Sequence, residues 1–185
     1  IICENYPYPE NTGSNIRTMN FIRFFEKRGV IDLGYIQGTK KINNIPNNIR
    51  NEYSLKKLIY PEDYWGKLKM WLMGFPYPIL EYDSDSLTKI LIAIETNDYD
   101  YIGVRHIKNS SILFYLSKVH YKKVIIDFDD ILSGDLYPIF FDKNTNYYNK
   151  LYRALNKWML KKYEIKCKLI GVSLFCSDVD LKLFN

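Results

Sequence analysis

The sequence predicts one α/β domain with a doubly wound, mostly parallel sheet that carries helices on both faces. Short apolar runs alternate with helical patterns along all 185 residues, as expected for a chain built from βαβ units. The length suits a single domain, and no internal repeat or low-complexity linker divides it. Because crossovers between parallel strands are nearly always right-handed, few topologies remain. We therefore expect a Rossmann-like domain over residues 1–185.

The first half of the chain is predicted to contain two strands and three helices. The strands cover residues 1–3 and 30–36, and a turn-rich loop over residues 6–15 separates the first strand from its helix. That helix ends at Gly29 as a C-terminal cap. Its apolar face is formed by Ile16, Met19, Phe21, Ile22, Phe24 and Phe25.

Residues 39–60 are rich in Asn and weakly patterned, so we expect a long excursion without a strand. A helix over residues 62–73 follows, ended by Gly74 and the prolines after it. The third helix is capped by Ser84 or Ser86 and extends through Ile94.

The second half alternates in the same way. Strands are predicted over residues 99–104, 123–127 and 168–175, and a short helix capped by Asn109 or Ser110 follows the first of them. The longest helix covers about residues 145–163. After the last strand, Ser177-Asp178 is expected to cap a further helix.

The longest helix has an apolar face and a basic stripe. The apolar face is predicted to contain Tyr148, Leu151, Tyr152, Leu155, Trp158 and Met159. The basic stripe on the opposite side contains Lys150, Arg153, Lys157 and Lys161. Two interpretations stay open: a solvated face, or peripheral contact with anionic membrane lipid.

Composition limits the partners. The net charge of +5 suits anionic ligands such as phosphates or acidic lipid surfaces, but no nucleic-acid-binding module is recognisable. The most apolar stretch, residues 70–80, is shorter than the roughly 20 residues that span a bilayer. Cys3, Cys167 and Cys176 are unpatterned, which predicts buried thiols in a reducing compartment, not a disulfide framework or a zinc site. A cytoplasmic location follows, with the cytoplasmic membrane face as a place of peripheral contact.

Ligands of open parallel sheets collect at the carboxyl ends of the strands, and three polar groups are predicted there. The first is the loop over residues 9–15, where Thr12, Gly13 and Ser14 precede a helix. Backbone amides at such a helix start bind a phosphate or a sugar hydroxyl. The alternative is a turn with an N-cap by Ser14 or Asn15, and the dinucleotide-binding G-x-G-x-x-G spacing is absent.

The second group is Arg105-His106, which follows a predicted strand. Arginine holds phosphate in a fork geometry and histidine titrates near neutral pH, although a surface pair at this place is as often structural. The third group is Asp127, Asp129 and Asp130 at the end of a buried apolar strand. A carboxylate there accepts a proton, orients a sugar hydroxyl or holds a cation, whereas the alternative is a helix cap with solvated charge. We expect Asp127 and Asp129 to project to different sides of the strand end.

Several of these segments resemble one enzyme family. The stretch from Tyr6 to Thr18, with its proline-led loop, Gly13 and Arg17, is similar to the first loop and helix of family 4 glycosyltransferases of the GT-B architecture. Residues 98–102, the Asp-x-Asp-Asp end of the strand at residues 124–130, and residues 170–180 resemble later parts of the same amino-terminal domain.

The resemblance implies a retaining transfer of a sugar from a nucleotide-sugar donor to a glycan or lipid-linked acceptor held by this domain. Gly13 and Ser14 match the loop that approaches the donor, and Asp129 stands where many members carry a histidine. The resemblance implies no metal cofactor. The donor-binding glutamates belong to a carboxyl-terminal domain in this family, so we expect the chain alone to show little or no transfer.

Two other functions remain open. Asp127-Phe128-Asp129 after an apolar strand has the shape of the haloacid-dehalogenase phosphatase motif, in which the first aspartate is a nucleophile and the second an acid/base. However, only 58 residues follow Asp127, which is short for that class. The other alternative is a non-catalytic α/β binding module in which the aspartates only cap a helix.

Overall fold

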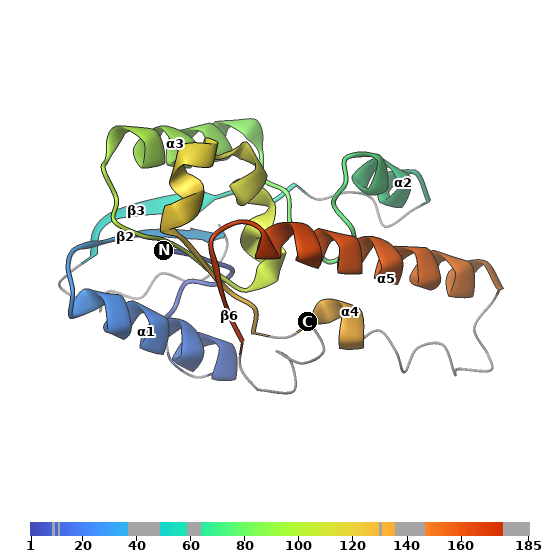
Figure 1. The fold of residues 1–185 in the computed structure, drawn as a ribbon, viewed down its shortest axis with the longest axis horizontal. Helices are drawn as coiled ribbons and strands as arrows, with labels where there is room; N and C mark the ends of the chain where they lie inside the picture. The colour runs from blue at the N-terminus through green and yellow to red at the C-terminus, as the bar shows by residue number, and fades with distance from the viewer. Residues whose placement is uncertain are drawn as a thin grey trace.

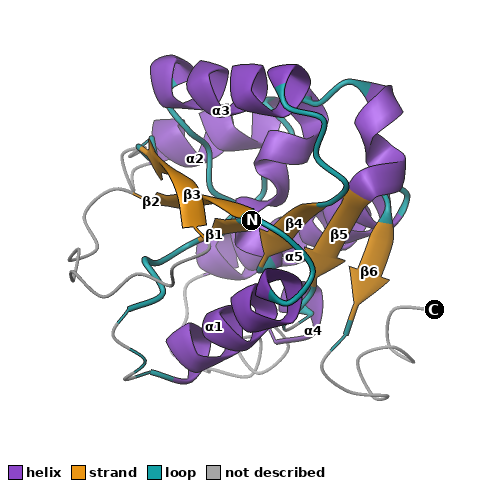
Figure 2. Cartoon of the chain, turned by 90° about the vertical axis from the view of Figure 1, so that its left-hand side faces the viewer, coloured by secondary structure: helices purple, strands orange, loops and turns teal. Residues whose placement is uncertain are grey.

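The computed structural model contains one six-stranded, all-parallel sheet in the order β3-β2-β1-β4-β5-β6 (Figures 1 and 2). It describes residues 1–8, 10, 12–36, 49–58, 64–129, 131–135 and 147–175. The predicted Rossmann-like α/β fold is confirmed. The strands are β1 (Ile2–Cys3), β2 (Ile31–Ile36), β3 (Ile49–Leu55), β4 (Ile102–Arg105), β5 (Val124–Asp127) and β6 (Val172–Leu174).

Helices cover both faces of the sheet. The α-helices are α1 (Gly13–Glu26), α2 (Tyr64–Leu72), α3 (Ser84–Thr96), α4 (Leu132–Asp135) and α5 (Tyr147–Lys168), and the 3-10 helices are η1 (Ile107–Tyr115) and η2 (Lys118–Lys123). Figure 2 shows α1 on one side of the sheet and α3 on the other. In Figure 1, α2 and the first half of α5 extend beyond the sheet at one end.

Each face of the sheet has its own apolar core, as a doubly wound fold requires. The smaller core joins α1 to β1 and β2 through Cys3, Tyr6, Met19, Ile22, Ile31 and Leu33. The larger core packs β4 and β5 against α3, η1 and α5, and among its members are Ile90, Val104, Ile112, Leu113, Ile126 and Leu160.

The expected excursion over residues 39–60 is partly wrong, because β3 forms within it at Ile49–Leu55. This strand pairs with β2 alone and leaves Arg50 and Asn51 exposed. An edge strand with polar side chains lacks the apolar alternation by which a strand is recognised in a sequence. Residues 37–48 lie outside the described part.

Helix caps also differ from the predicted ones. Thr12 caps α1, since its Oγ1 accepts from the Asn15 amide at 3.2 Å, and Lys27 replaces Gly29 at the other end. Asp83 caps α3 by accepting from the amides of Asp85 and Ser86. His106 precedes η1, so Asn109 and Ser110 lie inside that helix and not at its cap. Neighbouring polar residues compete for one cap, and the backbone path decides between them.

The predicted faces of the longest helix are wrong. Leu151, Leu155 and Trp158 are exposed, whereas its buried side contains Asn156, Leu160, Tyr163, Glu164 and Cys167. The helix also continues to Lys168, so the last strand begins at Val172 and not at residue 168. Apolar residues occur on both sides of this helix, and periodicity alone cannot say which side meets the sheet.

The thiols of Cys3 and Cys167 are buried and unpaired, as predicted, and burial raises the pKa of each to about 12. Cys176 and the predicted cap at Ser177-Asp178 lie outside the described residues. Among the described helices, none combines the length and apolar character needed to cross a bilayer.

Candidate functional site

The strand order reverses between β1 and β4, and ligands of open α/β sheets commonly bind at the carboxyl ends of strands beside such a reversal. The loop after β1 leads into the amino terminus of α1, while Arg105 ends β4 and Asp127 ends β5. All three groups predicted from the sequence therefore lie at the same edge of the sheet. We call Arg17, Arg105, Asp127 and Asp129 the ionic cluster.

Arg105 is the centre of the ionic cluster. Its side chain is only 2% exposed, and its Nη2 donates to Asp129 Oδ2 at 2.8 Å. Its Nε lies 3.1 Å from Asp127 Oδ2. The two aspartates therefore meet at one guanidinium, and the expectation that they project to different sides is wrong. Pairing with a shared cation offsets the cost of placing two carboxylates in a partly buried position.

Two nitrogens of Arg105, Nε and Nη1, are buried without a hydrogen-bond partner among the described residues. Nε has the ion-pair contact to Asp127, whereas no ion pair is recorded for Nη1 among these residues. A buried guanidinium N–H without an acceptor is costly, so such groups commonly mark the position of an unseen acceptor. The sequence-based interpretation of Arg105 as half of a surface pair missed this burial, because a strand-ending arginine is usually solvated.

Arg17 joins α1 to the ionic cluster from the solvent side. Its Nη1 forms a short ion pair with Asp129 Oδ1, and its side chain is 54% exposed. Asp129 thus contacts two arginines, one buried and one exposed. The Arg17 guanidinium is half exposed at this edge of the sheet, and a guanidinium suits the geometry of phosphate and carboxylate groups.

Asp127 differs from Asp129 in its surroundings. Burial raises the pKa of Asp127, and the positive charges of Arg105 and Arg17 oppose that effect. A carboxylate with a raised pKa holds a proton more readily than an ordinary aspartate. Asp127 combines this property with a contact to Arg105, whereas Asp129 contacts two guanidinium groups.

His106 is held in an unusual backbone conformation, with φ of 72°. Its Nδ1 accepts from the Lys108 amide at 3.3 Å, which leaves the proton of the neutral ring on Nε2. Burial lowers its pKa to about 4, with further contributions from Lys108 and Arg105. The ring is neutral near pH 7 and presents an N–H donor. Positive φ at a residue other than glycine concentrates at functional sites.

The start of α1 completes this edge. Thr12 is engaged in capping, Gly13 is the first helical residue, and Ser14 accepts from the Thr18 hydroxyl through its backbone oxygen. A methyl group at Gly13 would find no atom within 4 Å, so the space beside it is open. Amides at the start of a helix of this length attract anions. Asp130, the remaining predicted residue, lies outside the described residues.

An apolar groove of about 750 Å³ begins at the ionic cluster and continues between α1 and the last two strands. Arg17 and Asp127 lie at its polar end, and its walls include Phe21, Phe24, Val172 and Leu174. A ligand with a charged part and an apolar part matches this gradient. The sequence indicated the polar end only.

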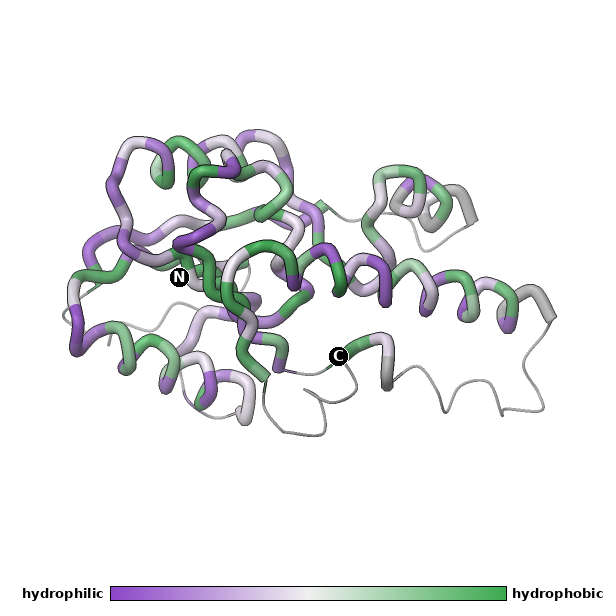
Figure 3. The backbone as a smooth tube through the Cα atoms, in the orientation of Figure 1, coloured by the Kyte–Doolittle hydropathy of each residue, from purple (hydrophilic) through white to green (hydrophobic). Residues whose placement is uncertain are grey.

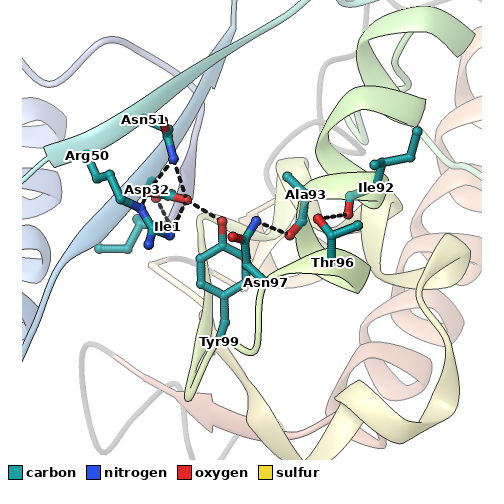
Figure 4. Close-up of polar contacts among 9 residues, drawn as sticks. All are labelled: Ile1, Asp32, Arg50, Asn51, Ile92, Ala93, Thr96, Asn97 and Tyr99. Carbon is teal, nitrogen blue, oxygen red and sulfur yellow. Dashed lines mark hydrogen bonds and ion pairs between the residues drawn. The ribbon is translucent and has the colours of Figure 1, made fainter.

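A second polar cluster occurs at the opposite, amino edge of the sheet, and sequence reasoning missed it (Figure 4). Asp32 accepts from Arg50 at 3.0 and 2.9 Å, from the Asn51 amide group and from the Tyr99 hydroxyl. Burial raises the pKa of Asp32, but the hydrogen bonds from Arg50, Tyr99 and Asn51 outweigh it and bring the pKa to about 2. The carboxylate is fully satisfied, so this cluster ties β2, β3 and the segment before β4 together.

Among the described residues, no group of three or more potential metal ligands converges. Comparisons with protein-family models, curated proteins and solved structures find no match for this chain. The function is therefore argued from the carboxyl-edge geometry and from the motifs of the sequence.

Proposed function

We propose that this domain is the acceptor-side half of a retaining, GT-B type glycosyltransferase, and that it binds sugar and phosphate groups at the carboxyl edge of its sheet. The observation that carries this proposal is the ionic cluster at the topological switch point, where Arg105 is buried with an unused N–H group. The resemblance of the first loop and of the Asp127 strand end to that family supports it.

The carboxyl edge of the sheet offers a group for each interaction that such a substrate requires. Arg17 and the first amides of α1 suit the negative charge of a phosphate. Asp127 suits the hydroxyl group of an acceptor sugar. As the glycosidic bond forms, the bond between the donor sugar and its phosphate breaks, the nucleotide leaves with the bonding electron pair, and the hydroxyl proton passes to Asp127. The Nε2–H of His106 donates to a neighbouring sugar oxygen. The apolar groove beyond Arg17 accommodates the lipid part of a lipid-linked acceptor.

A cytoplasmic location belongs to this proposal. Free, buried thiols at Cys3 and Cys167 are typical of proteins kept in a reducing compartment. Nucleotide-sugars act here as co-substrates, and the proposal needs no resident metal ion.

The phosphatase alternative is less well supported by the same geometry. A nucleophilic Asp127 would have to attack phosphorus while its Oδ2 lies 3.1 Å from the Arg105 guanidinium, and Asp129 would have to shuttle protons while it is bound to two arginines. Hydrolysis of an aryl phosphate with Mg²⁺ that is lost in Asp127→Asn would favour the phosphatase over the transferase.

Calorimetric titration of the chain with nucleotide-sugars and with free sugars tests the proposal. We expect binding that Arg17→Gln weakens about tenfold, the effect of losing one charge-assisted contact. Arg50→Gln is the matched control, because Arg50 is an equally exposed arginine at the amino edge of the sheet. Equal losses in both variants, or no binding by the unaltered chain, would contradict the proposal and favour a binding module for other ligands.

A further inference from the structure

Helix α5 carries a second apolar stripe that faces solvent. Leu151, Leu155, Trp158 and Ile165 recur at spacings of four, three and seven residues, and Leu169 continues the stripe just beyond the helix. Trp158 is 57% exposed and Leu169 is 78% exposed. The opposite side of α5 packs into the larger core through Leu160 and Tyr163, and the residues of the outer stripe are not members of either core of the described residues.

The charged residues of α5 that flank this stripe are all lysines. At about 100° per residue, Lys150, Lys157, Lys161 and Lys168 form a row along one flank of the stripe. Lys166 lies on the other flank, and the Nζ of Lys162 sits 3.6 Å from the Trp158 ring centroid. The one acidic residue of the helix, Glu164, is buried and bound to Ser133. The outer face of α5 is thus basic and apolar without a compensating carboxylate from the helix itself. Figure 3 shows hydrophobic and hydrophilic residues alternating along this helix.

The segment that packs beside α5 also exposes apolar side chains. Trp71 of α2 stacks on Tyr152 of α5 with ring centroids 5.0 Å apart, and Asn156 of α5 fixes the backbone of Tyr77 with two hydrogen bonds. At the last residue of α2 and just after it, Leu72, Met73 and Tyr77 are exposed at 81%, 43% and 62%. Figure 1 shows α2 beside the part of α5 that extends beyond the sheet.

We propose that this surface, defined by the outer stripe of α5 with its lysine row, docks on a membrane that carries anionic lipid headgroups. An apolar stripe with a tryptophan enters the boundary between headgroups and acyl chains, while flanking lysines contact the headgroup charge. The surface lies apart from the ionic cluster, so this inference does not depend on the proposed enzymatic function.

Two other occupants fit the charges less well. A second copy of the chain, joined symmetrically through this face, would place one lysine row near another with no exposed acidic residue of α5 between them. The phosphates of a nucleic acid would suit the lysines. They would not suit the apolar side chains along the centre of the face, which are Leu151, Leu155 and Ile165.

Co-sedimentation of the full chain with vesicles tests the inference. Vesicles of phosphatidylcholine mixed with phosphatidylserine should bind the chain, pure phosphatidylcholine vesicles should not, and added salt should weaken binding. Lys157→Gln with Lys161→Gln should weaken partitioning at least tenfold, since each lysine near an anionic surface contributes about a fivefold factor. Leu155→Gln with Trp158→Ser should weaken it to a similar extent.

The matched control is Ile92→Gln, because Ile92 is a similarly exposed apolar residue on α3, with an exposure of 55%. All these positions are at the surface, and thermal unfolding checks that each variant folds. Equal sedimentation with neutral and anionic vesicles, or equal loss in the Ile92 variant, would overturn the inference. So would self-association in analytical ultracentrifugation that the α5 substitutions abolish, or competition by a duplex DNA for the same surface.

Discussion

Arg105 and Asp129 form a buried ion pair that joins the end of β4 to the turn after β5, with Nη2 and Oδ2 2.8 Å apart. Because Asp129 also contacts the exposed Arg17, this pair links the interior of the sheet to a guanidinium that faces solvent. The position of Arg17 is thereby fixed by a buried partner and not by surface chemistry alone. Preorganisation of this kind lowers the cost of binding a charged ligand.

Removing the buried guanidinium is expected to be strongly destabilising. Arg105→Met leaves Asp127 and Asp129 without their shared cation, and breaking one side of a buried pair costs about 3–5 kcal/mol. Arg50→Met is the control, since Arg50 is half exposed and its loss should cost about 1 kcal/mol. Urea denaturation measures both. Similar midpoints for the two variants would mean that the ionic cluster does not stabilise the fold.

Gly13→Ala should change stability and binding in opposite directions. The added methyl group meets no atom within 4 Å, and alanine in place of glycine within a helix stabilises by about 0.5 kcal/mol. If a phosphate approaches the start of α1, the same methyl group obstructs it and nucleotide-sugar affinity falls. Thermal unfolding and calorimetric titration provide the two readouts. An affinity equal to that of the unaltered chain would show that the bound ligand does not approach Gly13.

His106 should make the fold sensitive to mild acid. Its pKa in the folded chain is about 4, below the ordinary value of 6.5, so its contribution to the free energy of unfolding is complete above pH 6.5. The contribution is lost as the pH falls toward 4, by about 3 kcal/mol at most. His106→Asn removes the titrating group and retains a residue type that tolerates positive φ. Chemical denaturation from pH 7 to pH 4 should show a shallower decline for the variant, and parallel curves would contradict this assignment.

Gly171→Ala should be among the most damaging single substitutions. Gly171 has φ of +76°, and a Cβ there would lie 2.2 Å from the backbone oxygen of Val124. Because a backbone atom cannot move aside as the end of a flexible side chain can, we expect the free energy of unfolding to fall by about 3 kcal/mol or more. Gly74→Ala measures the cost of positive φ alone, since Gly74 has φ of +82° with open space around it. This substitution should lower the free energy of unfolding by about 1 kcal/mol. Equal losses at both glycines would show that the close contact after α5 is tolerated.

The sequence predicted the sheet and the edge that holds the polar residues, because parallel strands place their carboxyl ends together. It did not predict that Asp127 and Asp129 converge on Arg105, since the turn after β5 sets the direction of each carboxylate. The amino-edge cluster was missed because Asp32 and Tyr99 are 67 residues apart in sequence. The faces of α5 were misassigned because Leu151 and Trp158 satisfy a helical period as well as the core residues do.

The central claim is that the carboxyl edge of the sheet at the β1–β4 reversal binds nucleotide-sugar and acceptor groups. Residue-resolved NMR titration of the chain with a nucleotide-sugar tests it most directly. Amide shifts should concentrate at residues 12–17, Arg105 and His106, and Arg17→Gln should reduce them. Shifts confined to the amino edge around Asp32 and Tyr99, or their absence throughout the chain at high ligand concentration, would contradict the account.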